Sequence, residues 1–230
     1  MNAIRIRVVR VFFRGVVAFL MWGALGTVPA WADVETIQPP DADASLDQNS
    51  ENLNLGAATF MKVVSWDNGF READNWRILV RFDLSGIPTG STINDASLQL
   101  CLDSISGDQS TRSYGAHLVT TAWVESEVTA SEASLGVPWN NYFGDFDPNA
   151  TDIVPISKVA LTNNPDQFIP WDVTADVQAI VDGDPNKGWL IKDENEDKPK
   201  RYTTLWVSKE SSSIACGDPS SPKLIVDFTP

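Results

Sequence analysis

The sequence predicts an all-β fold, a jelly-roll-like antiparallel β-sandwich with one short helix. Short segments alternate apolar and polar residues, and clusters of Gly, Pro, Asn, Asp and Ser separate these segments. Residues 76–82 place Trp, Ile, Val and Phe at every second position, and residues 96–103 do the same with three leucines. A period of two is typical of strands with one buried face.

Nine segments have strand character. In chain order they are Thr59–Val64, Trp76–Phe82, Ala96–Asp103, Tyr114–Val119, Ile153–Ala160, Gln167–Asp172, Gly188–Lys192, Tyr202–Ser208 and Lys223–Thr229. About nine or ten short, mostly antiparallel strands favour a sandwich or jelly roll over an α/β fold.

One segment departs from the strand pattern. Apolar residues at positions 173, 177, 180 and 181 recur at helical spacing. Thr174 is a suitable N-cap and Gly183 a suitable stop. We therefore expect a short helix over Thr174–Val181, packed against the end of a sheet.

The first 32 residues are typical of an export signal. Four arginines and no acidic residue precede an apolar stretch from Gly15 to Val28, and Ala30-Trp31-Ala32 supplies a small-x-small cleavage pattern. The apolar stretch is shorter than the roughly 20 residues that a membrane-spanning helix needs. We expect cleavage after residue 32, a short tail over 33–40, and a single domain over 41–230. The expected location is secreted, periplasmic or at the cell surface, with no membrane span.

Charge and cysteine content narrow the partners. Cleavage would remove four of the 17 basic residues and leave 13 against 31 acidic ones, a formal charge of −18. Such a chain repels nucleic acid and anionic lipid. Cys101 and Cys216 are the two cysteines of the chain. In an oxidising compartment they are most simply a disulfide, and two free thiols are the alternative.

Several strings resemble the DNRLRE domain family, which overlaps carbohydrate-binding module family 96 and the disaggregatase-related repeats. The core string is DNWRILVRFDLSGIP at 74–88, and further matches follow in the order of the family: ASLQL at 96–100, HLVT at 117–120, VPWNN at 137–141, WDVT at 171–174, DGDPNKG at 182–188, VSKES at 207–211 and SPKLIV at 221–226. The resemblance runs from about Asp41 to Thr229. It implies a jelly-roll sandwich found in exported proteins. It also implies carbohydrate binding, in some members of acidic polysaccharide, without catalysis.

We therefore expect a non-catalytic carbohydrate-binding protein at the cell surface or in the extracellular matrix. The alternative is a structural subunit of a filament, surface layer or adhesin, in which strand edges join copies together. The longer loop at Thr129–Gly136 departs from the family pattern. His117 is the single histidine, so a His-dependent triad or a multi-histidine metal site has little basis, and we expect no enzyme.

The candidate ligand-binding residues fall into two kinds. Trp66, Trp76 and Tyr142 are the candidates for a platform on which sugar rings stack. Lys62, Arg77 and Arg81 are the candidates for binding an acidic polysaccharide, because guanidinium groups pair well with carboxylates. The two arginines are expected on the outward side of their strand. Pairing with carboxylates of the protein itself is the alternative.

A structural calcium ion is the one cofactor that the sequence suggests. Three loops carry Asp and Asn at alternate positions, beginning at residues 145, 182 and 193, and calcium prefers oxygen ligands of this kind. We choose Asp193, Asn195 and Asp197 as the candidate ligands. None of the loops has Gly at the sixth position, so none is an EF-hand loop. The alternative is that Asp and Asn simply favour turns.

Overall fold

The computed structural model describes residues 31–67, 69, 73–158 and 167–230. Thirteen strands and one helix lie in this part of the chain. Their bounds are β1 Asp33–Ile37, β2 Ala42–Asp47, β3 Phe60–Ser65, β4 Trp76–Arg81, β5 Thr92–Gly107, β6 Thr111–Leu118, β7 Glu132–Ser134, β8 Val137–Pro138, β9 Asp152–Ser157, β10 Gln167–Asp172, α2 Thr174–Val181, β11 Trp189–Asp193, β12 Tyr202–Val207 and β13 Lys223–Thr229.

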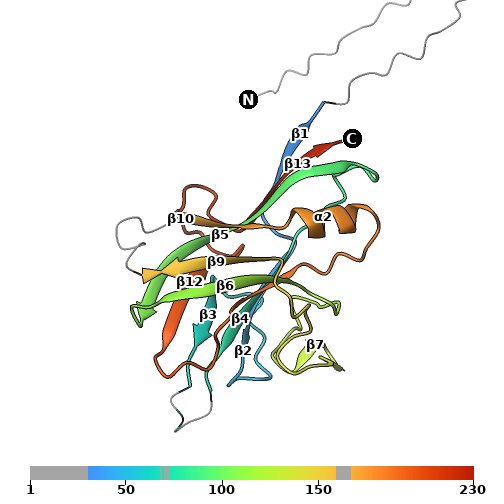
Figure 1. Ribbon diagram of the computed structural model, residues 1–230. Helices are drawn as coiled ribbons and strands as arrows, with labels where there is room; N and C mark the ends of the chain where they lie inside the picture. The colour runs from blue at the N-terminus through green and yellow to red at the C-terminus, as the bar shows by residue number, and fades with distance from the viewer. Residues whose placement is uncertain (1–30, 68, 70–72, 159–166) are drawn as a thin grey trace, which may run out of the picture.

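Eleven of the strands form one curled antiparallel sheet (Figure 1). Its order is β1-β13-β5-β12-β3-β4-β11-β6-β9, with β10 paired to β5 and β2 paired to β4. Strands β3 and β4 share a single residue pair, Val64 with Trp76. The strands on the two sides of this junction enclose one core, so the sheet folds over itself as a sandwich. The predicted all-β sandwich is confirmed.

The main core lies between the two layers. It takes residues from both, including Leu98 and Leu100 of β5, Ile78 and Val80 of β4, and the fully buried Trp206 of β12. The alternation that predicted these strands thus marks residues that pack inward. Burial of such large apolar side chains supplies most of the stabilisation of the sandwich, at about 1.5–3 kcal/mol for each.

A second apolar cluster covers the opposite face of β2, β4 and β11. Leu46, Leu79 and Leu190 contribute from the strands, while Trp123 and Trp139 contribute from the 119–146 segment, which includes β7 and β8. This face was expected to be outward. The structure corrects this, because the 119–146 segment packs on it and leaves the side chains of Arg77 and Arg81 only 12% and 26% exposed.

All nine predicted strands overlap observed ones, and the helix bounds are as predicted. The end of the predicted strand Ile153–Ala160 lies outside the described residues. The capping prediction was wrong: Val173 is the N-cap, and the Thr174 hydroxyl donates to Asp172 Oδ1 at 2.6 Å. Gly183 does end the helix, with a φ of 120° that favours glycine.

Four observed strands were not predicted: β1, β2, β7 and β8, the last two of which have only three and two residues. Residues 33–37, expected as part of a tail, form β1 and pair with β13. The apolar residues Val34 and Ile37 are three positions apart, so the segment has no period-two signal. Strand β2 is buried at all six positions, because β4, the 119–146 segment and the turn after β12 surround it. A strand with the sequence ADASLD has too few apolar residues to be identified from periodicity.

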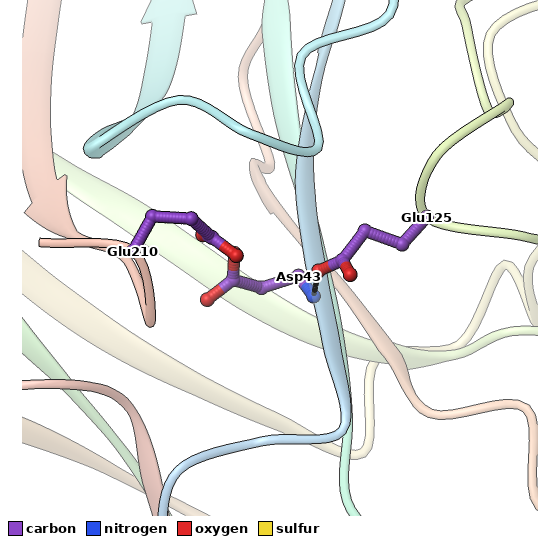
Figure 2. Close-up of side chains that lie close together, drawn as sticks. All are labelled: Asp43, Glu125 and Glu210. Atoms are coloured by element: carbon purple, nitrogen blue, oxygen red, sulfur yellow. Dashed lines mark hydrogen bonds between the residues drawn. The ribbon is translucent and has the colours of Figure 1, made fainter.

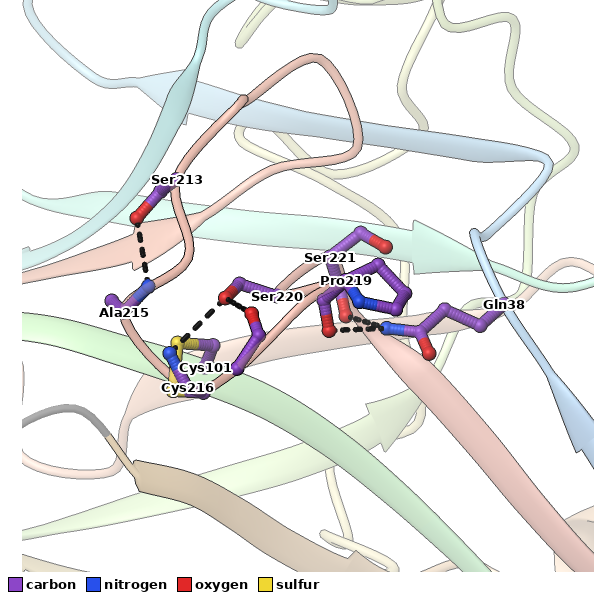
Figure 3. The surroundings of a disulfide bond; sticks show 9 residues. Gln38, Cys101, Ser213, Ala215, Cys216, Pro219, Ser220 and Ser221 are labelled. Carbon is purple, nitrogen blue, oxygen red and sulfur yellow. Dashed lines mark hydrogen bonds between the residues drawn. A yellow bond between two sulfur atoms is a disulfide. The ribbon is translucent and has the colours of Figure 1, made fainter.

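Cys101 of β5 and Cys216 form the predicted disulfide (Figure 3). It ties the loop between β12 and β13 to the middle of β5. On the same loop, the carbonyl oxygen of Ser221 accepts a hydrogen bond of 2.6 Å from Gln38 Nε2. The half-cystines are 115 residues apart, and in the chain-entropy model a bridge over so long a loop contributes about 4–5 kcal/mol. In the described part of the chain, no helix is long and apolar enough to cross a membrane.

Candidate functional site

Two half-buried tryptophans lie in a group of charged side chains where β3 ends and β4 begins. The Lys62 ammonium lies 4.6 Å from the centre of the Trp76 ring, and the Arg201 guanidinium lies 5.6 Å from that of Trp66. Asp74 connects the two halves: its Oδ1 accepts from Trp76 Nε1 at 3.0 Å, and its Oδ2 pairs with Arg201. We call Lys62, Trp66, Asp74, Trp76 and Arg201 the end cluster.

Buried Asn75 holds the end cluster in place. Its Nδ2 donates to Asp197 Oδ1 at 2.6 Å and to Gln48 Oε1 at 2.8 Å. Its Oδ1 accepts from the backbone N–H of Trp66 at 3.4 Å. An asparagine can make these bonds at once because its amide has both donors and an acceptor. Asn75, which precedes Trp76 at the start of β4, thereby fixes this end of the sandwich to the loop between β11 and β12.

The end cluster has the chemistry that sugar binding requires. Indole rings provide apolar faces for pyranose rings, while carboxylate, ammonium and guanidinium groups bond with hydroxyl groups and fix their orientation. Lys62, Trp66 and Trp76 were predicted from the sequence, and the structure brings them together. Asp74 and Arg201 were missed. The signal for Arg201 was the basic string KPKR at 198–201 in an otherwise acidic chain.

The other three predicted ligand-binding residues lie elsewhere. Arg77 makes a two-bond pair with Glu196, with N–O distances of 2.8 and 2.7 Å, and its guanidinium lies 4.2 Å from the centre of the Phe143 ring. Tyr142 stacks on Phe143 and is 51% exposed. Arg81 pairs with Asp41 at 2.7 Å. The six predicted residues therefore do not form one site, and the binding role of these three stays a prediction.

Three carboxylates gather beside β2 (Figure 2). Asp43, Glu125 and Glu210 each place an oxygen within 4.8 Å of the others. The Lys209 ammonium supplies positive charge here, 2.6 Å from Glu125 Oε2. Asp43 itself is buried, and its Oδ2 accepts a hydrogen bond from the backbone N–H of Lys209 at 2.8 Å. Burial, together with the neighbouring glutamates, raises the pKa of Asp43 to about 8.

The predicted calcium ligands point to separate partners. Asp193 is fully buried with its Oδ2 3.6 Å from Arg112 Nη1, and that oxygen has no hydrogen-bond partner among the described residues. Burial raises the pKa of Asp193. The backbone carbonyl of Asn195 accepts from the Ser65 hydroxyl, and Asp197 accepts from Asn75. Calcium binding by these residues stays a prediction.

Comparison with known protein families identifies the family of this chain. The sequence profile of carbohydrate-binding module family 96 matches residues 35–217, which is more than half of the chain. No curated protein matches the chain. The matched residues include nearly the whole sandwich and all five members of the end cluster. The chain therefore belongs to carbohydrate-binding module family 96.

Proposed function

We propose that this chain is an exported, non-catalytic protein that binds polysaccharide at the cell surface or in the extracellular matrix, and that the end cluster is its binding site. One observation carries the location: Trp66 and Trp76 are held in place by a network of polar bonds yet remain half-exposed. Indole rings at the surface of a soluble fold lose the stabilisation of full burial. A sugar ring stacked on them would recover part of it.

Paired substitutions test the location. Trp66→Ala with Trp76→Ala should weaken binding to polysaccharide at least tenfold, since stacking on aromatic rings contributes about 1 kcal/mol or more for each ring. Tyr142→Ala is the comparison variant, because it removes an exposed aromatic ring that is not a member of the end cluster, although its hydroxyl donates to the Gln48 carbonyl at 2.8 Å. Binding is measured by affinity electrophoresis against neutral and acidic polysaccharides, with the melting temperature of each variant checked first. Equal weakening by the two changes, or weakening by Tyr142→Ala alone, would remove the proposed location.

Export is supported by the arginine-rich, apolar N-terminal segment and by the disulfide, which persists in oxidising compartments. Expression in a secreting host tests it. The released protein should begin at Asp33, and its intact mass should show Cys101 and Cys216 oxidised. A released chain that retains residues 1–32 would contradict the cleavage.

Self-association is the second candidate function. Strands β1 and β9 stand at the two ends of the strand order, and each exposes an apolar side chain: Val34 at 61% and Ile153 at 50%. Exposed strand edges favour pairing with other chains. Size-exclusion chromatography with light scattering distinguishes the candidates, because a monomer that binds polysaccharide supports the binding module. A polymer without affinity for any polysaccharide supports a structural subunit.

A structural calcium ion at Asp193, Asn195 and Asp197 is a further proposal. Binding to the folded state alone would raise the melting temperature in millimolar calcium relative to a chelator. An Asn195→Ala variant should lose that shift if its side chain is a ligand. Identical melting temperatures in chelator and calcium would remove the proposal.

A further inference from the structure

The β7–β8 hairpin places apolar side chains in solvent. Leu135, at its turn, is 80% exposed, and Val137 of β8 is 48% exposed. Val124, whose N–H donates to the carbonyl of Ala133 in β7 at 3.0 Å, adds a side chain that is 44% exposed. We call Val124, Leu135 and Val137 the hairpin surface. Neighbouring exposed apolar side chains of this kind mark a surface that contacts another protein.

The backbone beneath the hairpin surface is held in one conformation. The N–H of Leu135 donates to Glu127 Oε2 at 3.0 Å, and that of Gly136 donates to Glu132 Oε2 at 3.2 Å. Gly136 has a φ of 73°, which glycine adopts without strain, so the chain can turn between β7 and β8. A surface fixed in this way loses little conformational entropy when it binds.

The segment that carries the hairpin surface is acidic. Glu127 and Glu132 flank the turn, and no lysine or arginine occurs from residue 113 to residue 157. Glu51 lies beside the same hairpin, because its carbonyl accepts from the Ser131 N–H at 3.0 Å. A partner that matches this surface must therefore combine apolar groups with cations.

The end cluster and the adjoining residues 198–200 have these matching properties. Trp66 and Trp76 present half-buried indole rings. Neither Lys198 nor Lys200 has a carboxylate within ion-pair distance in the part of the chain that the structure describes. The N–H of the residue after Trp66 donates to the carbonyl of Lys198 at 2.7 Å, so the lysines adjoin the indoles. Apolar rings and cations thus lie side by side.

One molecule cannot bring its own two surfaces together. In Figure 1, β7 and β12 lie on opposite sides of β2 and β4, and residues 198–200 come just before β12. The strands between the two surfaces belong to one hydrogen-bonded sheet, which holds them apart. A contact between the hairpin surface and the lysines therefore requires two copies of the chain.

We propose that the hairpin surface of one copy docks on the end cluster of a second copy. Leu135 lies against the indole rings, and the two glutamates that flank the turn face Lys198 and Lys200. Contact between two hairpins, or between two end clusters, would bring like charges together, so opposite charges favour this arrangement. Because each copy contributes a different surface, the contact can repeat into a chain or close into a ring.

This inference goes beyond polysaccharide binding and does not depend on it. Docking differs also from the pairing of strand edges, because it uses side chains of the hairpin and of the end cluster. Docking and polysaccharide binding would use the same indole rings, so each would exclude the other.

The experiment uses two double variants of the full chain, as released by a secreting host, and their mixture. The hairpin variant carries Leu135→Ser with Val137→Ser, and the lysine variant carries Lys198→Gln with Lys200→Gln. Ile214→Ser is the control, because it removes a side chain that is 70% exposed elsewhere on the surface. Sedimentation velocity measures association over a range of protein concentrations at low and high salt, after the melting temperatures have been compared.

The wild type and the control should associate alike as concentration rises, and high salt should weaken the association. Each double variant alone should associate at least about tenfold more weakly. An equimolar mixture of the two variants should form a dimer that does not extend, because each variant supplies the surface that the other lacks.

Failure of the mixture to form this dimer would overturn the docking of hairpin on end cluster. Association that is unchanged in both variants would also overturn it and assign the contact to another surface, such as the strand edges. A wild type that stays monomeric at every concentration would overturn docking between copies and leave the hairpin surface to a different basic protein. None of these results would affect the proposed polysaccharide site, whose test measures binding to sugars.

Discussion

Two regions of the sandwich differ in whether their basic side chains form ion pairs. In the covered region, where the 119–146 segment packs on β2 and β4, Arg77 pairs with Glu196 and Arg81 pairs with Asp41. At the open end, formed by the end cluster and the adjoining residues 198–200, Lys198 and Lys200 have no carboxylate within ion-pair distance in the described residues. Both regions contain basic residues beside aromatic rings, and Arg201 at the open end pairs with Asp74. The two regions therefore differ in the two lysines.

The difference lies in burial. Arg77 and Glu196 expose 12% and 16% of their side chains, so an unpaired charge there would be costly. Lys200 and Arg201 are exposed, and water solvates an exposed charge whether or not it has a partner. The charges of the covered region therefore stabilise the fold, while we expect those of the open end to contribute little to stability and, under the proposed function, to act in binding. Substitutions in the covered region should change stability and leave binding intact.

The largest effect is expected at Asp43, the buried carboxyl at the edge of the covered region. Its folded pKa of about 8 lies above the unfolded value of 3.8. Between these pH values the folded state keeps a proton that the unfolded state releases, so stability falls as pH rises. The loss is about 1.4 kcal/mol per pH unit for one fully linked proton. Asp43→Asn should mimic the protonated form and escape this loss.

Urea unfolding at pH 5 and pH 8 measures the effect. The free energy of unfolding of Asp43→Asn, relative to the wild type, should rise by about 4 kcal/mol between the two pH values. Glu210→Gln is the matched control, since it removes a neighbouring carboxylate at the surface and should give a much smaller change. A difference between variant and wild type that is independent of pH would show that Asp43 is ionised in the folded protein.

Arg77 should give the next largest effect. Arg77→Gln removes both bonds to Glu196, the bond from Nη1 to the Phe143 carbonyl and the contact with the Phe143 ring. It also leaves a poorly exposed glutamate without its cation. We expect a loss of about 2–3 kcal/mol in the free energy of unfolding, measured in urea, and unchanged affinity for polysaccharide. Loss of affinity in a variant that remains folded would restore Arg77 as a ligand-binding residue.

The sequence predicted the sandwich because its central strands bury one face, and their apolar and polar residues therefore alternate. It did not predict β2, where burial on all sides removes the alternation, or β1, whose apolar residues Val34 and Ile37 are three positions apart. It also did not predict β7 and β8, which have only three and two residues. Among the candidate site residues, the alternation along residues 76–82 placed Arg77 and Arg81 on the opposite face of the strand from Val80. It could not show that the 119–146 segment covers that face. The partners of Arg77 and Trp66, Glu196 and Arg201, lie more than 100 residues away in the chain, and only the folded topology brings them together.

The smallest effect is expected at Arg81, which shares its strand and its face with Arg77 but is more exposed. Arg81 and Asp41 expose 26% and 35% of their side chains, and such pairs contribute about 0.2–1 kcal/mol. Contact with the Trp123 ring, at 5.2 Å, and a bond of 3.2 Å to the Trp123 carbonyl add to this. Arg81→Gln should therefore cost about 1 kcal/mol in urea unfolding, clearly less than Arg77→Gln. Raising the salt concentration should reduce the cost at Arg81 more than at Arg77, because screening acts on exposed pairs first. Equal costs with equal salt dependence would mean that the 119–146 segment shields both arginines alike, and burial would then no longer distinguish the two ends of β4.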